Sequence, residues 1–139
     1  MAREVLVDSS GLYLLADRRD PKRPVAKKCV ESLIRAGVTL LLTDYIVGET
    51  CTLAKSRGGP HGAVELLDML EASYAFTLVW IGEERFARAK TFFRKHADHG
   101  YSFTDCTSFV LMRELGILDA FTTDRHFKEA GFRPLLPLR

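Results

Sequence analysis

Apolar positions along this chain follow two alternating spacings, which predicts strands and helices in alternation. Short apolar runs, typical of buried strands, occupy 4–7, 38–43, 76–81 and 119–123. Apolar residues at helical spacing predict helices over 9–18, Val25 to Ala36, Tyr45 to Lys55, 61–73, Glu83 to His96 and Thr104 to Leu115. A break at 57–60 separates two of these helices, 125–130 adds one or two helical turns, and Pro134 favours an edge position for a last strand over 132–136.

This alternation predicts an α/β fold in which a mostly parallel central sheet carries helices on both faces. A chain of 139 residues is long enough to bury one core and too short for two, so we expect a single domain over 1–139. In such sheets, ligands bind outside the carboxyl ends of the strands, near the point where the strand order reverses. Acidic side chains at strand ends are therefore the first candidates for a functional site.

Composition narrows the class of protein without indicating its activity. The net charge of +2, from 20 basic and 18 acidic side chains, is no evidence for nucleic-acid binding. The three cysteines are odd in number and form no CxxC pair, which favours reduced thiols over disulfides or a structural zinc site. Since no segment reaches the roughly 18 to 20 apolar residues of a membrane span, we expect a cytoplasmic protein with no membrane contact.

Four acids lie at strand ends or in the helices that follow them. Asp8 follows the first strand, Glu49 lies in the helix after the second, Asp105 begins a helix, and Asp124 follows the fourth strand. Taken singly, the three aspartates are explained as helix caps and Glu49 as an exposed helical residue. Taken together, they would repel one another at one sheet edge unless a cation were present, and oxygen ligands suit Mg²⁺ or Mn²⁺.

Four segments carry a resemblance to a known family. "VLVDSSGL", "IVGET", "SFTDCTSFVLMRELGI" and "AFTTDRHF" resemble the successive acidic motifs of the PIN domain family, especially the VapC-type toxin ribonucleases of toxin-antitoxin pairs. The resemblance covers nearly the whole chain and implies a three-layer α/β/α sandwich with a metal-dependent site that hydrolyses RNA. The implied catalytic and metal-binding residues are Asp8, Glu49, Asp105 and Asp124, and the implied supporting hydroxyls are Ser9, Thr104 and Thr123.

Within the implied site, Asp8, Asp105 and Asp124 would hold Mg²⁺ or Mn²⁺ directly or through water. Glu49 would ligate a second ion or orient the nucleophile, and the sequence leaves one and two ions equally open. For the helix that contains Asp105, we expect Thr104 to be the cap. The implied partners are an RNA substrate and a cognate antitoxin with a basic tail, and the apolar helices around 66–70 and 86–93 predict a homodimer.

Other functions compete with this interpretation. A phosphoacceptor receiver domain needs an aspartate at the end of its third strand, where "FTLVWI" has none, and a haloacid-dehalogenase-type phosphatase needs an aspartate where Ser10 stands. A non-catalytic RNA-binding or protein-interaction module of the same fold remains open, as does a housekeeping RNA-processing nuclease. Metal-dependent cleavage of RNA distinguishes the enzyme from the non-catalytic module.

Overall fold

A five-stranded sheet forms the centre of the molecule, in the strand order β3-β2-β1-β4-β5. The computed structural model describes residues 3–139. The strands are β1 (Glu4–Val7), β2 (Thr39–Thr43), β3 (Phe76–Val79), β4 (Asp119–Phe121) and β5 (Arg133–Pro134). Each neighbouring pair is parallel, and Leu6 of β1 faces Leu41 on one side and Ala120 on the other. The prediction of a mostly parallel sheet is confirmed, and the strand with Pro134 lies at an edge, as expected.

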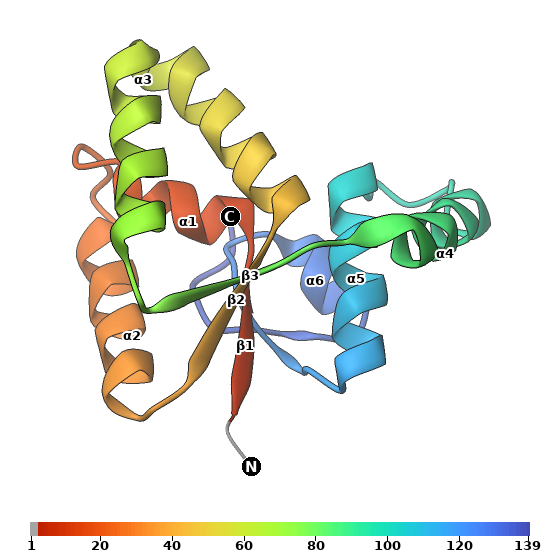
Figure 1. Ribbon diagram of the computed structural model, residues 1–139. Helices are drawn as coiled ribbons and strands as arrows, with labels where there is room; N and C mark the ends of the chain where they lie inside the picture. Colours follow the sequence, from red (N-terminus) through yellow and green to blue (C-terminus); the bar gives the residue numbers. More distant parts are fainter. Residues whose placement is uncertain (1–2) are drawn as a thin grey trace.

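Helices cover both faces of this sheet. They are α1 (Ser9–Ala16), α2 (Arg23–Arg35), α3 (Asp44–Ala72), α4 (Gly82–Lys95), α5 (Phe103–Leu115) and α6 (Arg125–Glu129). The first three lie on one side of the sheet and the last three on the other (Figure 1), which confirms the three-layer α/β/α architecture. The change of side occurs at β1, whose neighbours are β2 and β4. The carboxyl end of β1 is therefore the switch point at which this fold class binds ligands.

The core is built on the two central strands and the helices against them. Val5, Leu6 and Val7 are fully buried, as are Phe109 of α5 and Phe121 of β4. Burial of such a side chain contributes roughly 1.5–3 kcal/mol to folding, so these central residues fix the position of the switch point. The three cysteines are free thiols, as expected. Among residues 3–139, no helix has both the length and the apolar character needed to cross a membrane.

The helix α3 is interrupted where the sequence predicts a break. Gly59 has φ 82° and ψ 175°, a conformation outside the helical region, and Pro60 follows it. The chain reverses there, so the two halves of α3 form a hairpin (Figure 1). Several predicted boundaries differ by one or two residues. For example, α2 begins at Arg23 rather than Val25, because Pro24 is favourable in the first helical turn.

Gly11 allows α1 to lie directly against β4. A methyl group at this position would collide with the carbonyl oxygen of Phe121 and would lie 2.6 Å from its ring. The same carbonyl accepts a hydrogen bond of 3.1 Å from the backbone N–H of Asp8. Gly11 lowers helix propensity in the sequence, and the structure gives the reason for its presence: no larger residue fits at this contact.

We expect Gly11→Ala to lower the free energy of unfolding by about 1–3 kcal/mol, because either α1 or Phe121 must move. Gly48→Ala is the matched control, since Gly48 is also helical and has open space around its α-carbon. That control should be neutral or stabilising by up to about 1 kcal/mol. Denaturant unfolding of both variants measures the difference, and equal stabilities would contradict the close-contact explanation.

Candidate active site

Asp8 is a buried carboxylate held on one oxygen. It caps α1, and its Oδ2 accepts hydrogen bonds from the Ser10 hydroxyl at 2.8 Å and the Thr122 hydroxyl at 2.7 Å. Its other oxygen, Oδ1, is only within 3.5 Å of the Ser9 hydroxyl. The side chain is 2% exposed. The structure thus fixes the orientation of this carboxylate and leaves Oδ1 weakly engaged within the protein.

Glu49 lies on the first half of α3 and is linked to Asp8 through Ser9. The Ser9 hydroxyl donates a 3.0 Å hydrogen bond to Glu49 Oε1. Glu49 is exposed, which agrees with its placement on the open side of a helix. The expectation of an exposed helical residue is therefore confirmed for Glu49, and its carboxylate also reaches the Asp8 side of the cavity.

Asp105 is held in a reciprocal capping box at the start of α5. Ser102 is the N-cap residue, its hydroxyl accepts a 3.0 Å hydrogen bond from the backbone N–H of Asp105, and its own N–H donates to Asp105 Oδ2 at 3.0 Å. The expectation that Thr104 caps this helix is wrong. Thr104 already lies inside the helix, where its carbonyl accepts a hydrogen bond from Thr107.

Asp124 is the N-cap of α6, and its Oδ1 accepts a 2.9 Å hydrogen bond from the backbone N–H of His126. Its own backbone N–H donates to the Thr122 hydroxyl at 3.0 Å. Thr122 therefore connects Asp124 to the carboxylate of Asp8. The capping interpretation holds for all three aspartates, and in each case the cap also orients the carboxylate.

The four acids line one cavity of about 300 Å³ at the carboxyl end of the sheet. The lining residues are Asp8, Ser9, Ser10, Glu49, Leu53, Gly100, Ser102, Asp105, Asp124 and His126. Of the three predicted supporting hydroxyls, Ser9 lies in this cavity, whereas Thr104 and Thr123 are not among the lining residues. Thr123 is buried behind the cavity, where its N–H donates to the Ser10 hydroxyl.

Sequence analysis did not identify Ser10, Ser102, Thr122 and His126 as parts of this site. Thr122 carries no local signal of its contact with the site, because its hydroxyl donates to Asp8, 114 positions away. Ser10 and His126 do carry one, since each follows an acid by two residues. Such spacing places a hydroxyl or ring within reach of the neighbouring carboxylate. Ser102 was detectable as the first residue of an S-x-x-D capping box.

Burial and mutual repulsion change the acidity of these groups. Burial raises the pKa of Asp105 to about 7, the hydrogen bond from Ser102 opposes this shift, and the charges of Asp8 and Asp124 add to it. Burial likewise raises the pKa of Asp8, against the hydrogen bonds from Thr122 and Ser10. Two buried carboxylates with raised pKa values in one cavity identify this cavity as a candidate functional site that positive charge would stabilise.

The donor set fits a divalent cation. Carboxylate oxygens from Asp8, Glu49, Asp105 and Asp124 all reach the cavity, and hard cations such as Mg²⁺ and Mn²⁺ prefer oxygen ligands. The raised pKa of Asp105 means that its carboxyl group keeps a proton up to about pH 7, and a bound cation would take the place of that proton. The chemistry of the residues present is therefore consistent with a metal centre at the switch point.

The raised pKa of Asp105 predicts how stability depends on pH without metal. Between its usual value of 3.8 and about 7, the folded protein holds a proton that the unfolded chain releases. The free energy of unfolding should therefore fall as pH rises through this window, by up to about 1.4 kcal/mol per pH unit. Denaturant unfolding from pH 5 to 8 in chelator measures this slope.

Asp105→Asn should reduce that slope and raise stability at pH 8, since the amide keeps an acceptor for Ser102 and carries no charge. Asp98→Asn, at an exposed position outside the cavity, is the control and should leave the slope unchanged. A stability profile that is flat in the wild type, or identical in wild type and Asp105→Asn, would show that Asp105 retains no proton.

Comparison with known proteins agrees with this geometry. The 23S rRNA-specific endonuclease VapC20 of Mycobacterium tuberculosis is 29% identical over 133 residues, which cover 96% of this chain and 98% of the relative. The crystal structure of Mycobacterium tuberculosis VapC20, described as a sarcin-ricin loop cleaving toxin, has a TM-score of 0.84 at 28% identity, covering 96% of this chain and 99% of its own.

A more distant structure shares the fold alone. VapBC2 from Rickettsia felis, bound to a DNA fragment from its promoter, has a TM-score of 0.68 at 8% identity and covers 91% of this chain and 92% of its own. The model of the PIN domain family matches residues 5–133, which is nearly the whole chain. The chain therefore belongs to the PIN domain family.

Proposed function

We propose that this protein is a metal-dependent endoribonuclease of the cytoplasm, and that it acts as the toxin of a toxin-antitoxin pair. The observation that carries the proposal is the cavity at the switch point, where four carboxylates converge in a member of the PIN domain family. The similarity to a 23S rRNA-specific endonuclease over nearly the full length of both chains supports RNA as the substrate. The raised pKa values of Asp8 and Asp105 show a site where buried negative charge is unfavourable, and this supports the binding of a cation there.

The proposed roles follow from how each carboxylate is held. Asp8, Asp105 and Asp124 bind the cation directly or through water, and Ser10, Thr122 and Ser102 keep the first two carboxylates oriented. When bound, a divalent ion activates a water molecule for attack on phosphorus and neutralises charge on the phosphate. Glu49, which is exposed and accepts a hydrogen bond from Ser9, orients that water or binds a second ion.

The first substrate to test is a structured ribosomal RNA hairpin. VapC20 of Mycobacterium tuberculosis is described as cleaving the sarcin-ricin loop, and this chain is 28% identical to it. A sarcin-ricin hairpin therefore serves as the defined substrate, and total RNA serves as the unbiased one. Mapping the ends of the cleavage products identifies the sequence that this chain prefers.

We expect Asp8→Asn and Asp124→Asn each to reduce RNA cleavage on the order of 10²-fold or more, because each removes a charge that holds the cation. Both variants should remain folded, since asparagine preserves volume and its one amide oxygen can replace the carboxylate oxygen that accepts the hydrogen bonds. Gel-based cleavage of labelled RNA measures the rates, with Asp98→Asn as the surface control. Wild-type rates in either site variant would remove that residue from the catalytic set.

Chelation tests the metal requirement separately. Cleavage should stop in excess chelator and return when Mg²⁺ or Mn²⁺ is restored, because the carboxylates cannot replace the cation in positioning water. Full activity in excess chelator would contradict metal dependence. RNA binding without any cleavage, under every metal condition, would instead favour a non-catalytic module of the same fold.

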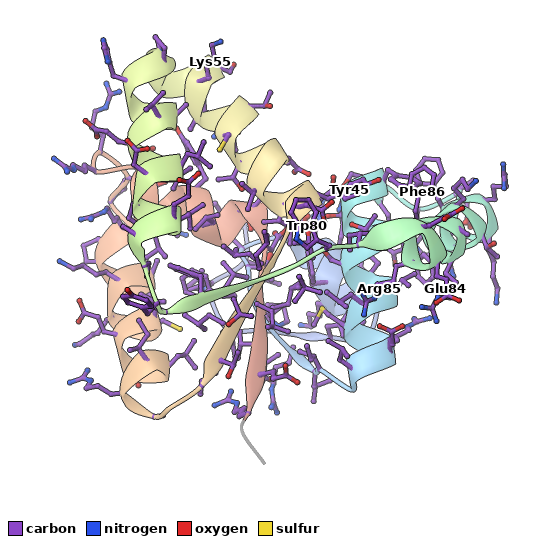
Figure 2. All side chains as sticks on the ribbon, in the orientation of Figure 1. Tyr45, Lys55, Trp80, Glu84, Arg85 and Phe86 are labelled. Carbon is purple, nitrogen blue, oxygen red and sulfur yellow. The ribbon has the colours of Figure 1, made fainter. Side chains whose placement is uncertain are left out.

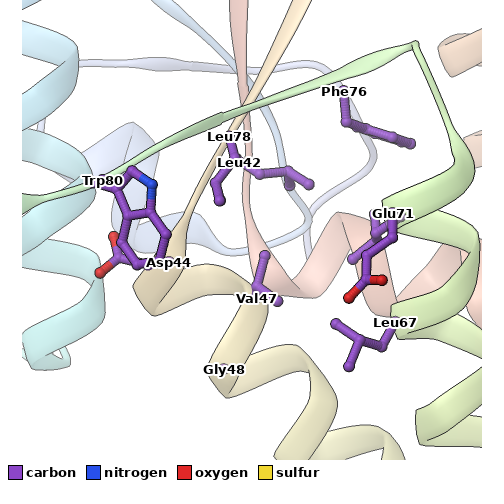
Figure 3. A pocket seen from close by; sticks show the side chains of 10 residues that line it. Leu42, Asp44, Val47, Gly48, Leu67, Glu71, Phe76, Leu78 and Trp80 are labelled. Atoms are coloured by element: carbon purple, nitrogen blue, oxygen red, sulfur yellow. The ribbon is translucent and has the colours of Figure 1, made fainter.

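Apolar side chains are exposed on and directly after the edge strand β3. Trp80 is 68% exposed at the end of β3 (Figure 2), and Leu78 of β3 is also exposed. An apolar cavity of about 450 Å³ lies between β3 and the two halves of α3, with Val47, Leu67 and Phe76 among its walls (Figure 3). Exposed apolar surface of this kind marks protein contacts, and it supports the proposed homodimer and antitoxin complex.

The proposed antitoxin acts on the acidic cavity itself. A basic side chain, most simply arginine, would pair with the carboxylates in a bidentate manner and compete with the metal or with the substrate phosphate. Such inhibition would prevent the ribonuclease from damaging the RNA of the cell that makes it. The antitoxin is then a small chain that combines a basic tail with an apolar segment for the exposed apolar surfaces.

We expect two copies of this chain to form a homodimer that purifies in complex with an antitoxin, the product of the neighbouring small open reading frame. The complex should be inactive until that antitoxin is removed. Co-expression followed by light scattering gives the assembly, and a cleavage assay before and after removal gives the inhibition. A monomer that neither binds the neighbour nor is inhibited by it would favour a housekeeping RNA-processing nuclease.

A further inference from the structure

His126 is the one nitrogen-bearing side chain found among the lining residues of the acidic cavity, for the part of the chain that the structure describes. Its Nδ1 lies 3.2 Å from Asp124 Oδ1 and 3.5 Å from Asp105 Oδ2. One ligand atom from each of these three side chains falls within 4.8 Å of the other two. The ring nitrogen and the two carboxylates are therefore close enough to bind one ion together.

The ring of His126 is packed against Gly100 and Tyr101, and the backbone of the residue is fixed as well. Gly100 packs against its other nitrogen, since a methyl group at position 100 would lie 3.0 Å from Nε2. The ring of Tyr101 packs against it edge to face, with centroids 5.6 Å apart and an interplanar angle of 80°. The backbone N–H of His126 is bonded to Asp124. Glycine at position 100 thus leaves room for a ring whose Nδ1 faces the acids.

We propose that Nδ1 of His126 is a direct ligand of the divalent cation, together with Asp105 and Asp124, and that the resulting nitrogen-and-oxygen donor set favours Mn²⁺ over Mg²⁺. The inference rests on the metal site of the proposed function and adds a residue and a metal preference to it. Mg²⁺ binds almost entirely through oxygen, whereas an imidazole nitrogen is an ordinary ligand for transition metals. Replacing one oxygen by nitrogen therefore shifts selectivity towards Mn²⁺.

A purely electrostatic role for His126 is the competing explanation. A protonated imidazole beside two carboxylates would offset their repulsion without touching a metal. The two explanations differ in one observable, because a ligand nitrogen is coupled to the electron spin of bound Mn²⁺ through the coordinate bond, far more strongly than a nitrogen that only lies nearby. The test is therefore spectroscopic and does not depend on nuclease activity.

Tag-free wild-type protein loaded with Mn²⁺ is examined by electron spin-echo envelope modulation. We expect a directly coordinated ¹⁴N signal, and we expect it to change to the ¹⁵N pattern when only histidine is labelled with ¹⁵N. This measurement needs no substitution, so it is independent of whether a variant folds. Bound Mn²⁺ with no nitrogen coupling overturns the inference.

Variants assign the nitrogen to His126. His126→Phe keeps a ring against Gly100 and Tyr101 and should lose the nitrogen signal, with Mn²⁺ affinity falling at least about tenfold and Mg²⁺ affinity changing less. The chain has four histidines, so the matched control replaces the other three, at positions 61, 96 and 99, by glutamine. That triple variant should keep the signal and the affinity of the wild type.

Affinities are measured by titrating the EPR signal of free Mn²⁺, with Mg²⁺ followed by competition. Equal Mn²⁺ affinity in wild type and His126→Phe overturns the inference and leaves the nuclease proposal intact. A histidine nitrogen signal in a protein that cleaves no RNA supports the inference and removes the nuclease proposal. A wild-type preference for Mg²⁺ over Mn²⁺ also overturns it.

Discussion

The buried carboxylate of Asp8 joins the two halves of this fold. The backbone N–H of Asp8 donates a hydrogen bond to the carbonyl of Phe121 in β4. Oδ2 of Asp8 accepts hydrogen bonds from one hydroxyl in α1 and from one in the segment after β4. A buried charge is costly unless it is hydrogen-bonded, so these partners must stay in place for the chain to fold as it does. The contact of Gly11 with Phe121 belongs to the same junction.

Three helix N-termini stabilise the negative charges of the site. Asp8 caps α1, Asp105 belongs to the capping box of α5, and Asp124 caps α6. Each carboxylate is bonded to backbone N–H groups at the positive end of a helix, which stabilises negative charge. Capping and metal binding are therefore not alternatives here, because the cap supplies the orientation that a ligand requires.

Buried acidic residues at the two ends of the sheet have pKa values shifted in opposite directions. At the start of β4, burial alone would raise the pKa of Asp119, but hydrogen bonds from Arg133 and Arg3 hold that pKa below its usual value. At the carboxyl end, no lysine or arginine within residues 3–139 forms an ion pair with the acids of the cavity, and the His126 ring is the basic side chain that lies beside them. The first arrangement stabilises the fold, whereas the second leaves repulsion that a cation would relieve. A functional site often lowers the free energy of unfolding in this way.

The positions of apolar and acidic residues in the sequence determined the fold class and the four acids of the candidate site. Strands buried on both faces leave a continuous apolar run, and acids that follow such runs must emerge at the same edge of a parallel sheet. For this reason Asp8 and Asp124, which directly follow strands, were identifiable from the sequence. Glu49 and Asp105 lie in helices, and their selection rested on convergence with the other acids and on the resemblance to the PIN domain family. The break at Gly59 was also predicted from the sequence.

Only the tertiary structure decided which side chains from distant segments complete the site. Thr122 and Ser10 are separated by 112 positions in the chain, and their hydroxyls meet at Asp8 only because β4 pairs with β1. Likewise, Gly100 holds the His126 ring across a contact that no local pattern encodes. By contrast, the cap at Ser102 rather than Thr104 was detectable in the local S-x-x-D pattern. Periodicity encodes burial and strand ends, whereas contacts between distant segments depend on strand order and close packing, which no local pattern contains.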